Sequence, residues 1–208
     1  MSKLKPVNFD QFTLKKAKIS DTTVECDFEE KRVIDGTAQV IEHNVKAKYL
    51  PHPDLTRLRD TLREYLIKAY HLNTGHEIAI KYLKGEQKQK VEESMMDLYD
   101  KVEVTGILIN GEDQFRGVVI SGKIESNNKS KCAMKTPRIV FSSEKLGYET
   151  DVEGQMELIE KEIYKYLFEG KKAQKDLFYD LDDNGDMPNA KDILVVDVQE
   201  VLVPSALE

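Results

Sequence analysis

The sequence predicts an α+β fold: two antiparallel three-stranded meanders, each followed by an amphipathic helix (βββα-βββα), and a further β-strand near the C-terminus. Six segments alternate apolar and polar residues, the period of half-buried strands. Two longer segments carry apolar residues at helical spacing instead. Because a meander has one apolar face, and one amphipathic helix is its natural cover, this order predicts two layers.

The N-terminal half contains the first meander and its helix. Strands are expected over residues 9–19, 23–33 and 37–49, and Asp35-Gly36 is typical of a tight hairpin turn. Pro51 and Pro53 end the third strand, and Asp54 can cap the following helix. The apolar stripe of that helix consists of Leu55, Leu58, Leu62, Leu66 and Ala69.

The second half repeats this order after a further helix, which we expect over residues 87–99. Strands are expected over residues 102–109, 115–124 and 131–142. The last helix begins at the capping box Thr150-Asp151-Val152-Glu153 and ends at Gly170. Its apolar stripe consists of Val152, Met156, Ile159, Ile163 and Leu167.

These elements predict four consecutive regions. Residues 1–84 form the first βββα unit and residues 85–170 the extra helix with the second unit, unless both merge into one compact domain. Residues 171–192 form an acidic loop. Residues 193–206 contain a β-prone strand, which we expect to pair with a sheet edge of its own chain or of a second subunit. Residues 207–208 resemble a tag remnant.

Composition indicates a soluble, cytosolic globular protein. Of its 208 residues, 40% are hydrophobic and 33% charged, and no apolar run approaches the roughly 20 residues of a membrane span. Its two cysteines, Cys26 and Cys132, fit a reducing compartment. Neither has Cys or His neighbours at ligand spacing, so we expect no zinc site and no cofactor.

Charge is unevenly placed along the chain. The net charge is -7, and residues 176–208 contain nine acidic residues and one lysine. This segment therefore carries -8, which leaves about +1 for residues 1–175. Such an acidic segment is either solvated or a contact for basic partners.

Basic and aromatic residues share several predicted strands. Lysines track phosphates and rings stack on bases when an open sheet binds single-stranded nucleic acid. An ordinary solvated sheet face with its aromatics turned inward is the alternative interpretation. The candidate nucleic-acid-binding residues are Lys46, Lys48, Tyr49, Phe115, Arg116, Lys123, Lys131, Lys135 and Arg138.

A short peptide after the last helix suggests a protein partner. Gln174, Asp176, Leu177 and Phe178 resemble the peptide with which bacterial and phage replication proteins hold the sliding clamp. Leu177 and Phe178 would fill an apolar groove, and Gln174 would set the polar register. Alternatively, Leu177 and Phe178 close a local core.

Signatures of catalysis and metal binding are sparse. Residues 180–186 resemble the opening of a calcium loop, but Lys191 stands where that loop needs a bidentate glutamate. The four histidines have no Cys, Ser or Asp at a recognisable spacing, and no phosphate-binding glycine loop is present. We therefore expect a non-enzymatic protein without a metal site.

The layout resembles small phage-encoded replication and recombination accessory proteins, some of which are similar to single-stranded-DNA-binding proteins that assist a recombinase. The resemblance covers much of residues 12–178. The segments that carry it are Tyr49-Leu50-Pro51-His52-Pro53-Asp54-Leu55, Val104-Thr105-Gly106-Ile107, Gly117-Val118-Val119-Ile120-Ser121-Gly122 and Glu169-Gly170-Lys171-Lys172-Ala173-Gln174. The helix over residues 87–99 and the C-terminal strand depart from the pattern.

The sequence therefore predicts a DNA-metabolism accessory protein. It would bind single-stranded DNA, and a sliding clamp or recombinase, in the host cytoplasm if it is phage-encoded. The alternative is a phage-type protein-interaction or inhibitor module that acts through its acidic segment. A nuclease or nucleotide hydrolase is a third hypothesis, which would need clustered acidic residues and a bound metal.

Overall fold

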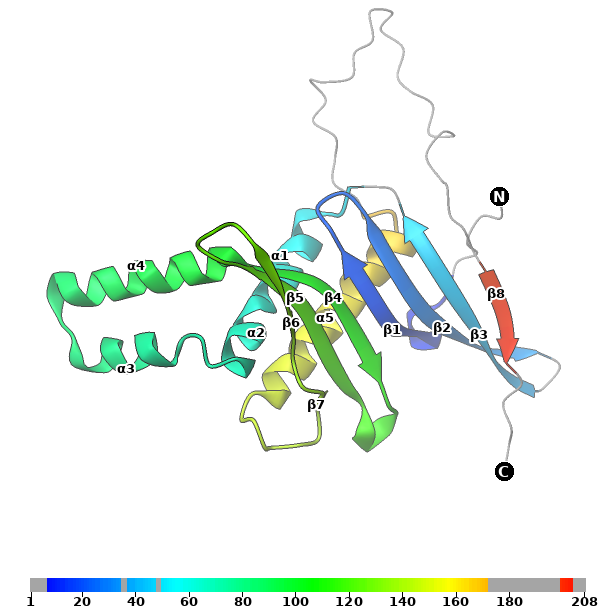
Figure 1. Cartoon of the computed structure of the whole chain (residues 1–208). Helices are drawn as coiled ribbons and strands as arrows, with labels where there is room; N and C mark the ends of the chain where they lie inside the picture. The colour runs from blue at the N-terminus through cyan, green and yellow to red at the C-terminus, as the bar shows by residue number, and fades with distance from the viewer. Residues whose placement is uncertain (1–6, 35–36, 48–49, 172–198, 204–208) are drawn as a thin grey trace, which may run out of the picture. The chain divides into compact units, whose positions relative to one another are not determined.

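The computed structural model describes residues 7–34, 37–47, 50–171 and 199–203, and it confirms an α+β protein with antiparallel strands (Figure 1). The strands are β1 (Phe12–Ile19), β2 (Val24–Ile34), β3 (Thr37–Ala47), β4 (Val102–Asn110), β5 (Gly117–Glu125), β6 (Lys131–Lys135), β7 (Ile139–Val140) and β8 (Gln199–Val203). The helices are α1 (Pro53–Thr61), α2 (Arg63–Ala69), α3 (Thr74–Tyr82), α4 (Gly85–Lys101) and α5 (Glu149–Phe168), with short 3-10 turns η1 (Phe9–Gln11) and η2 (Asp113–Phe115).

The chain forms two compact units. Unit 1 combines Met1–Arg57 with Glu157–Glu208, and unit 2 is Leu58–Met156. The chain crosses between the units inside helices α1 and α5. The boundary expected between residues 84 and 85 lies inside unit 2, at the turn between α3 and α4.

Unit 1 contains an antiparallel run of strands in the order β1-β2-β3-β8. A bulge interrupts the β1–β2 register between Leu14 and Lys16. Strand β8 pairs with β3 of its own chain and places Glu200 opposite His43. The expectation that the C-terminal segment joins a sheet edge is thus confirmed for Gln199–Val203.

An aromatic cluster forms much of the core of unit 1. Phe12 and Phe28 leave the same face of β1 and β2, and their ring centroids are 4.8 Å apart. From the C-terminal half of α5, Phe168 reaches Phe28 edge-on at 5.8 Å, and Tyr164 reaches Phe12 at 5.7 Å. The aromatic rings of these strands therefore turn inward, under the helix.

Unit 2 contains the strand order β6-β5-β4, with β7 pairing beside β5. Helix α2 packs on β4 and β5. A Cβ on Gly122 would lie 2.4 Å from Leu66 Cδ1 and 2.6 Å from the Glu103 carbonyl oxygen, so only glycine permits this helix–strand approach. Helices α3 and α4 form a hairpin in which no residue is buried.

Several expected elements differ from those observed. The first long helix breaks at Leu62 into α1 and α2, and α3 forms where a connector was expected. The strand expected over residues 131–142 is split by Thr136-Pro137-Arg138, because proline cannot donate to the ladder. Phe115 and Arg116 lie at a 3-10 turn rather than on a strand.

The last helix also begins differently from the expected capping box. Glu149 is its first residue, and its own carboxylate accepts the backbone N–H groups of Leu146 at 2.7 Å and Tyr148 at 3.0 Å. Its C-terminal stop is confirmed, since Gly170 has φ +73° and Lys171 N–H bonds the Lys165 carbonyl at 3.1 Å. No described helix meets the length and hydropathy that crossing a membrane requires.

Candidate nucleic-acid interface

On unit 1 the outer face of the sheet is balanced in charge. Lys46 of β3 bonds Glu25 of β2, and this hydrogen bond lowers the pKa of the Glu25 carboxyl. The lysines of β1 are paired with acids of β2 as well: Lys15 with Glu29 at 2.9 Å, Lys16 with Asp27 at 3.5 Å and Lys18 with Glu25 at 3.6 Å.

This pairing limits what the outer face of unit 1 can bind. Lys46 and the three lysines of β1 already have carboxylate neighbours, and Phe12 and Phe28 are buried on the other face. Single-stranded nucleic acid needs unpaired cations together with exposed rings. Of the residues predicted here, Lys46 is exposed but paired, whereas Lys48 and Tyr49 lie outside the described residues.

Unit 2 brings a ring and cations together at one end of β5 and β6. Phe115 exposes 64% of its surface, at the turn that leads from β4 into β5. One Arg138 nitrogen donates to the Asn110 carbonyl oxygen at 3.2 Å and also to the Phe115 carbonyl oxygen. The guanidinium of Arg116 lies 6.0 Å from the centroid of the Phe141 ring.

Strand β6 carries the basic residues along one sheet edge. Residues 129–138 contain four cations and no acid: Lys129, Lys131, Lys135 and Arg138. Tyr70 stabilises this strand. Its hydroxyl accepts a hydrogen bond from the Lys135 backbone N–H at 3.0 Å and donates one to the Lys135 carbonyl oxygen at 3.3 Å. Lysines on an edge strand also discourage edge-to-edge aggregation, which is the structural role of such residues.

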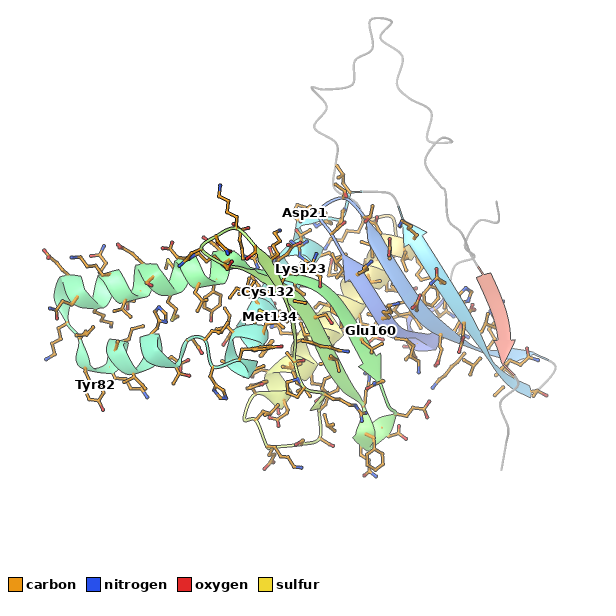
Figure 2. All side chains as sticks on the ribbon, in the orientation of Figure 1. Asp21, Tyr82, Lys123, Cys132, Met134 and Glu160 are labelled. Atoms are coloured by element: carbon orange, nitrogen blue, oxygen red, sulfur yellow. The ribbon has the colours of Figure 1, made fainter. Side chains whose placement is uncertain are left out.

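The other end of β6 borders a hollow of about 320 Å³ with mixed charge. Lys131 Nζ lies 3.2 Å from a Glu103 carboxylate oxygen, and Lys123 is directly opposite Glu103 in the strand register. Figure 2 labels Lys123, near Cys132 on the neighbouring strand. The hollow is lined by Asp97, Asp100, Lys101, Glu103, Lys123, Glu125 and Lys131.

The predicted residues thus divide into three groups. Phe115, Arg116, Lys135 and Arg138 lie together, whereas Lys123 and Lys131 belong to the mixed-charge hollow. Lys46 belongs to unit 1. Several acids surround the second group in the hollow, whereas the turn beside the first group contains Glu112 and Asp113. The first group is therefore the better phosphate-binding surface.

Comparison with known proteins adds no relative. No family model, curated protein or solved structure matches the chain.

The predicted clamp peptide and the calcium-like segment cannot be placed on this surface. The clamp-like peptide (Gln174, Asp176, Leu177 and Phe178) and residues 180–186 lie outside the described residues. Clamp binding by the first segment and the lack of a calcium site in the second therefore stay predictions. Within the described residues, no cluster of three or more His, Cys, Asp or Glu side chains is arranged to hold a metal ion.

Unit 1 also contains a buried polar group that was not predicted from the sequence. Glu30 exposes 2% of its surface, and its carboxylate lies 2.9 Å from His43 Nε2 and also bonds Arg32. The His43 ring stacks on Phe28 at 4.6 Å. The signal was present in the sequence, because Glu30 occupies the inward position of β2, two residues after Phe28.

Proposed function

We propose that the protein is a non-enzymatic accessory factor of DNA replication or recombination that binds single-stranded DNA along strand β6. The observation that carries this proposal is the acid-free run of cations over residues 129–138, beside the exposed ring of Phe115. The resemblance to phage replication and recombination accessory proteins agrees with this role.

The chemistry of the surface suits a single strand of nucleic acid. Lys131 and Lys135 are separated by four residues of extended chain, about 13 Å at roughly 3.3 Å per residue. Lys135 offers a cation to phosphates near the Phe115 end of β6, and Lys129 offers another beyond the opposite end. Phe115 offers a ring to a base.

Fluorescence anisotropy with a labelled oligonucleotide tests the proposal. Binding should weaken as salt rises, and Lys129→Glu with Lys135→Glu should reduce the slope of log affinity against log salt by about 0.7 for each phosphate that the variant no longer neutralises. Phe115→Ala should weaken binding by roughly 1–3 kcal/mol if its ring stacks on a base.

The control carries the same change of charge elsewhere. Lys16→Glu with Lys18→Glu on β1 alters lysines that already face Asp27 and Glu25, and it should leave oligonucleotide binding nearly unchanged. Equal losses in the two double variants would mean that only net charge matters. If the protein does not bind the oligonucleotide even at low salt, the proposed DNA-binding function is wrong.

A sliding clamp is the second proposed partner, through Gln174, Asp176, Leu177 and Phe178. The full chain should bind a purified clamp, and Leu177→Ala with Phe178→Ala should abolish the interaction because the apolar plug is lost. Leu181→Ala is the control, since it removes an apolar side chain just outside the motif. If the double variant binds the clamp as well as the parent protein does, this peptide does not bind the clamp.

The alternative function is a protein-interaction or inhibitor module that acts through the acidic segment. The nine acidic residues among residues 176–208 favour it. Changing Asp180, Asp182, Asp183 and Asp186 to Asn removes four charges without removing β8. Loss of a partner from a pull-down by this variant, together with no oligonucleotide binding by the parent protein, would support the alternative.

We also propose a more specific fold arrangement and a cellular location for the protein. We propose that the α+β architecture is an arrangement of two βββα halves, and that the protein works in the cytoplasm. The order β1 to β3 followed by α1 and α2 in the first half, and β4 to β7 followed by α5 in the second, supports the first idea. The unpaired thiols of Cys26 and Cys132 support the second, because thiols stay reduced in that compartment.

A further inference from the structure

The α3–α4 hairpin of unit 2 has no fully buried residue. α3 and α4 contact each other, and His76 Nε2 lies 3.2 Å from Ser94 Oγ between them. Every residue of α3 and of α4 is at least partly exposed to solvent. In Figure 1 the hairpin extends away from β4, β5 and β6 of the same unit. Amphipathic helices are normally stabilised by burying their apolar face, so this hairpin has an exposed face that a partner could cover.

The outer side of α3 carries two large exposed side chains. Ile78 and Tyr82 are four residues apart, which places them on one face of the helix, and they expose 53% and 81% of their surfaces. Figure 2 shows Tyr82 on the side of α3 that faces away from α4. Gly75 occupies the same face, and a Cβ added there would meet no atom within 4 Å.

Charges on the hairpin are separated along its length. The tip, residues 81–90, contains four lysines and one glutamate. The base, residues 91–101, contains four acidic residues and one lysine. Helix α4 spans 17 residues, or about 25 Å, so the two ends lie farther apart than the ~8 Å over which salt screens charge at physiological ionic strength.

We propose that the outer face of α3 docks against the same face of a second copy of this chain, with the two hairpins antiparallel. An antiparallel two-fold arrangement sets the basic tip of each hairpin beside the acidic base of the other. The acids of the base lie on α4, behind the docking face of α3, so this attraction acts across α3 and is strong at low salt, where the screening length is about 30 Å. A purely acidic partner such as nucleic acid would attract the tip but repel the base, so a second copy fits the charge pattern better.

The apolar residues fit the same symmetry. When two α3 helices run antiparallel with Ile78 near the two-fold axis, the Tyr82 ring of each copy lies over Gly75 of the other. The open space at Gly75 receives that ring, and Ile78 packs against its symmetry mate. Each copy thus supplies both the knob and the hole. We expect weak association, because two short helices bury less than the ~1,200 Å² of a standard interface.

Sedimentation velocity of the full chain, at low salt and up to about 1 mM protein, measures the association. A concentration-dependent shift towards dimer that weakens with added salt is expected. Tyr82→Glu should shift the protein to monomer, whereas Leu158→Glu, an exposed apolar position on α5, should not. Because Tyr82 is not buried, circular dichroism should find both variants folded.

A charge exchange tests the antiparallel arrangement. One variant carries Lys81→Glu, Lys84→Glu and Lys90→Glu at the tip, and a second carries Glu93→Lys, Asp97→Lys and Asp100→Lys at the base. Each alone should be monomeric, because tip and base then have the same sign. An equimolar mixture should form a heterodimer, because all its tip–base contacts are attractive again.

Three results would overturn the proposal. The first is a protein that stays monomeric at the highest concentration and lowest salt. The second is a dimer that Tyr82→Glu leaves intact, which is the result expected if the dimer forms through β8 instead. The third is a mixture of the two charge variants that stays monomeric. None of these measurements involves DNA or a clamp, so the inference stands apart from the proposed function.

Discussion

The carboxylate of Glu160 in α5 accepts a hydrogen bond from the backbone N–H of Leu14 in β1, with 2.8 Å between Oε1 and N. Both residues are buried and belong to unit 1, although they are 146 positions apart in the chain. A buried backbone N–H needs an acceptor, and here the covering helix supplies one that the sheet does not. This contact helps to set α5 on β1.

We expect Glu160→Ala to destabilise the protein by about 1–3 kcal/mol, because it leaves a buried donor without this acceptor. Glu160→Gln keeps an amide oxygen at the same reach and should cost less. Urea unfolding followed by circular dichroism measures both changes. If the two variants are equally stable, the Leu14 contact does not contribute as described.

The turn between β4 and β5 requires glycine at position 111. Gly111 has φ +80°, and a Cβ there would lie 2.2 Å from the Phe115 carbonyl oxygen and 2.4 Å from an Arg138 nitrogen. Gly111→Ala should therefore cost at least ~1–3 kcal/mol in unfolding free energy, measured by urea unfolding. Gly154 is exposed within α5, and a Cβ added there would meet no atom within 4 Å, so Gly154→Ala should instead stabilise by about 0.5–1 kcal/mol.

The two cysteines should differ sharply in reactivity. Cys26 is buried in β2, and burial raises the pKa of its thiol to about 12, whereas Cys132 is exposed on β6. Because the thiolate is the reactive form, a thiol reagent at about pH 8 should modify Cys132 in the folded protein and both cysteines after denaturation. Mass spectrometry identifies the sites. Rapid modification of Cys26 under native conditions would contradict its position in the core.

Lys171 joins two carboxylates in unit 1, with its Nζ 2.8 Å from Asp54 and 2.6 Å from Glu162. The hydrogen bond from Lys171 lowers the pKa of Asp54 below its usual 3.8. Burial raises the pKa of Glu162, but hydrogen bonds from Lys165 and Lys171 outweigh it, and the pKa falls below 4.5. The bonds to Asp54 and Glu162 raise the pKa of Lys171 above 10.5.

Lys171→Met should therefore lower the melting temperature modestly at neutral pH. The lowered carboxyl pKa values stabilise the fold above about pH 4.5 and lose that effect as pH falls through their folded values. The raised lysine pKa stabilises it below 10.5 and loses that effect as pH rises through its folded value. The difference from the parent protein should vanish at both extremes. Lys161→Met is the matched control, and an equal effect there would exclude a role for the cluster.

Local patterns in the sequence were enough to place most elements. Alternation placed β1 to β5, and the apolar stripe placed α5, whose Val152, Met156, Ile159 and Ile163 are all buried. The same rules could not foresee the break at Leu62, which remains fully buried within the stripe. Helical spacing predicts which residues point inward, but tertiary packing decides where the helix axis changes direction.

The candidate site followed from the sequence only in part. Phe115, Lys135 and Arg138 were selected as separate residues, and the hydrogen bond from Arg138 to the Phe115 carbonyl unites two of them. Lys46 was selected by the same reasoning, yet its pairing with Glu25 depends on the register of β2 against β3. Register connects residues far apart in the chain, and composition does not encode it.

The sequence by itself determined the α+β class, the end of the last helix at Gly170 and the apolar stripe of that helix, because each depends on neighbours a few residues away. Only the tertiary structure decided which lysines are paired with acids, which carboxylate meets the Leu14 amide and which helices lack a buried face. Those outcomes depend on distances between residues that folding brings together from remote parts of the chain.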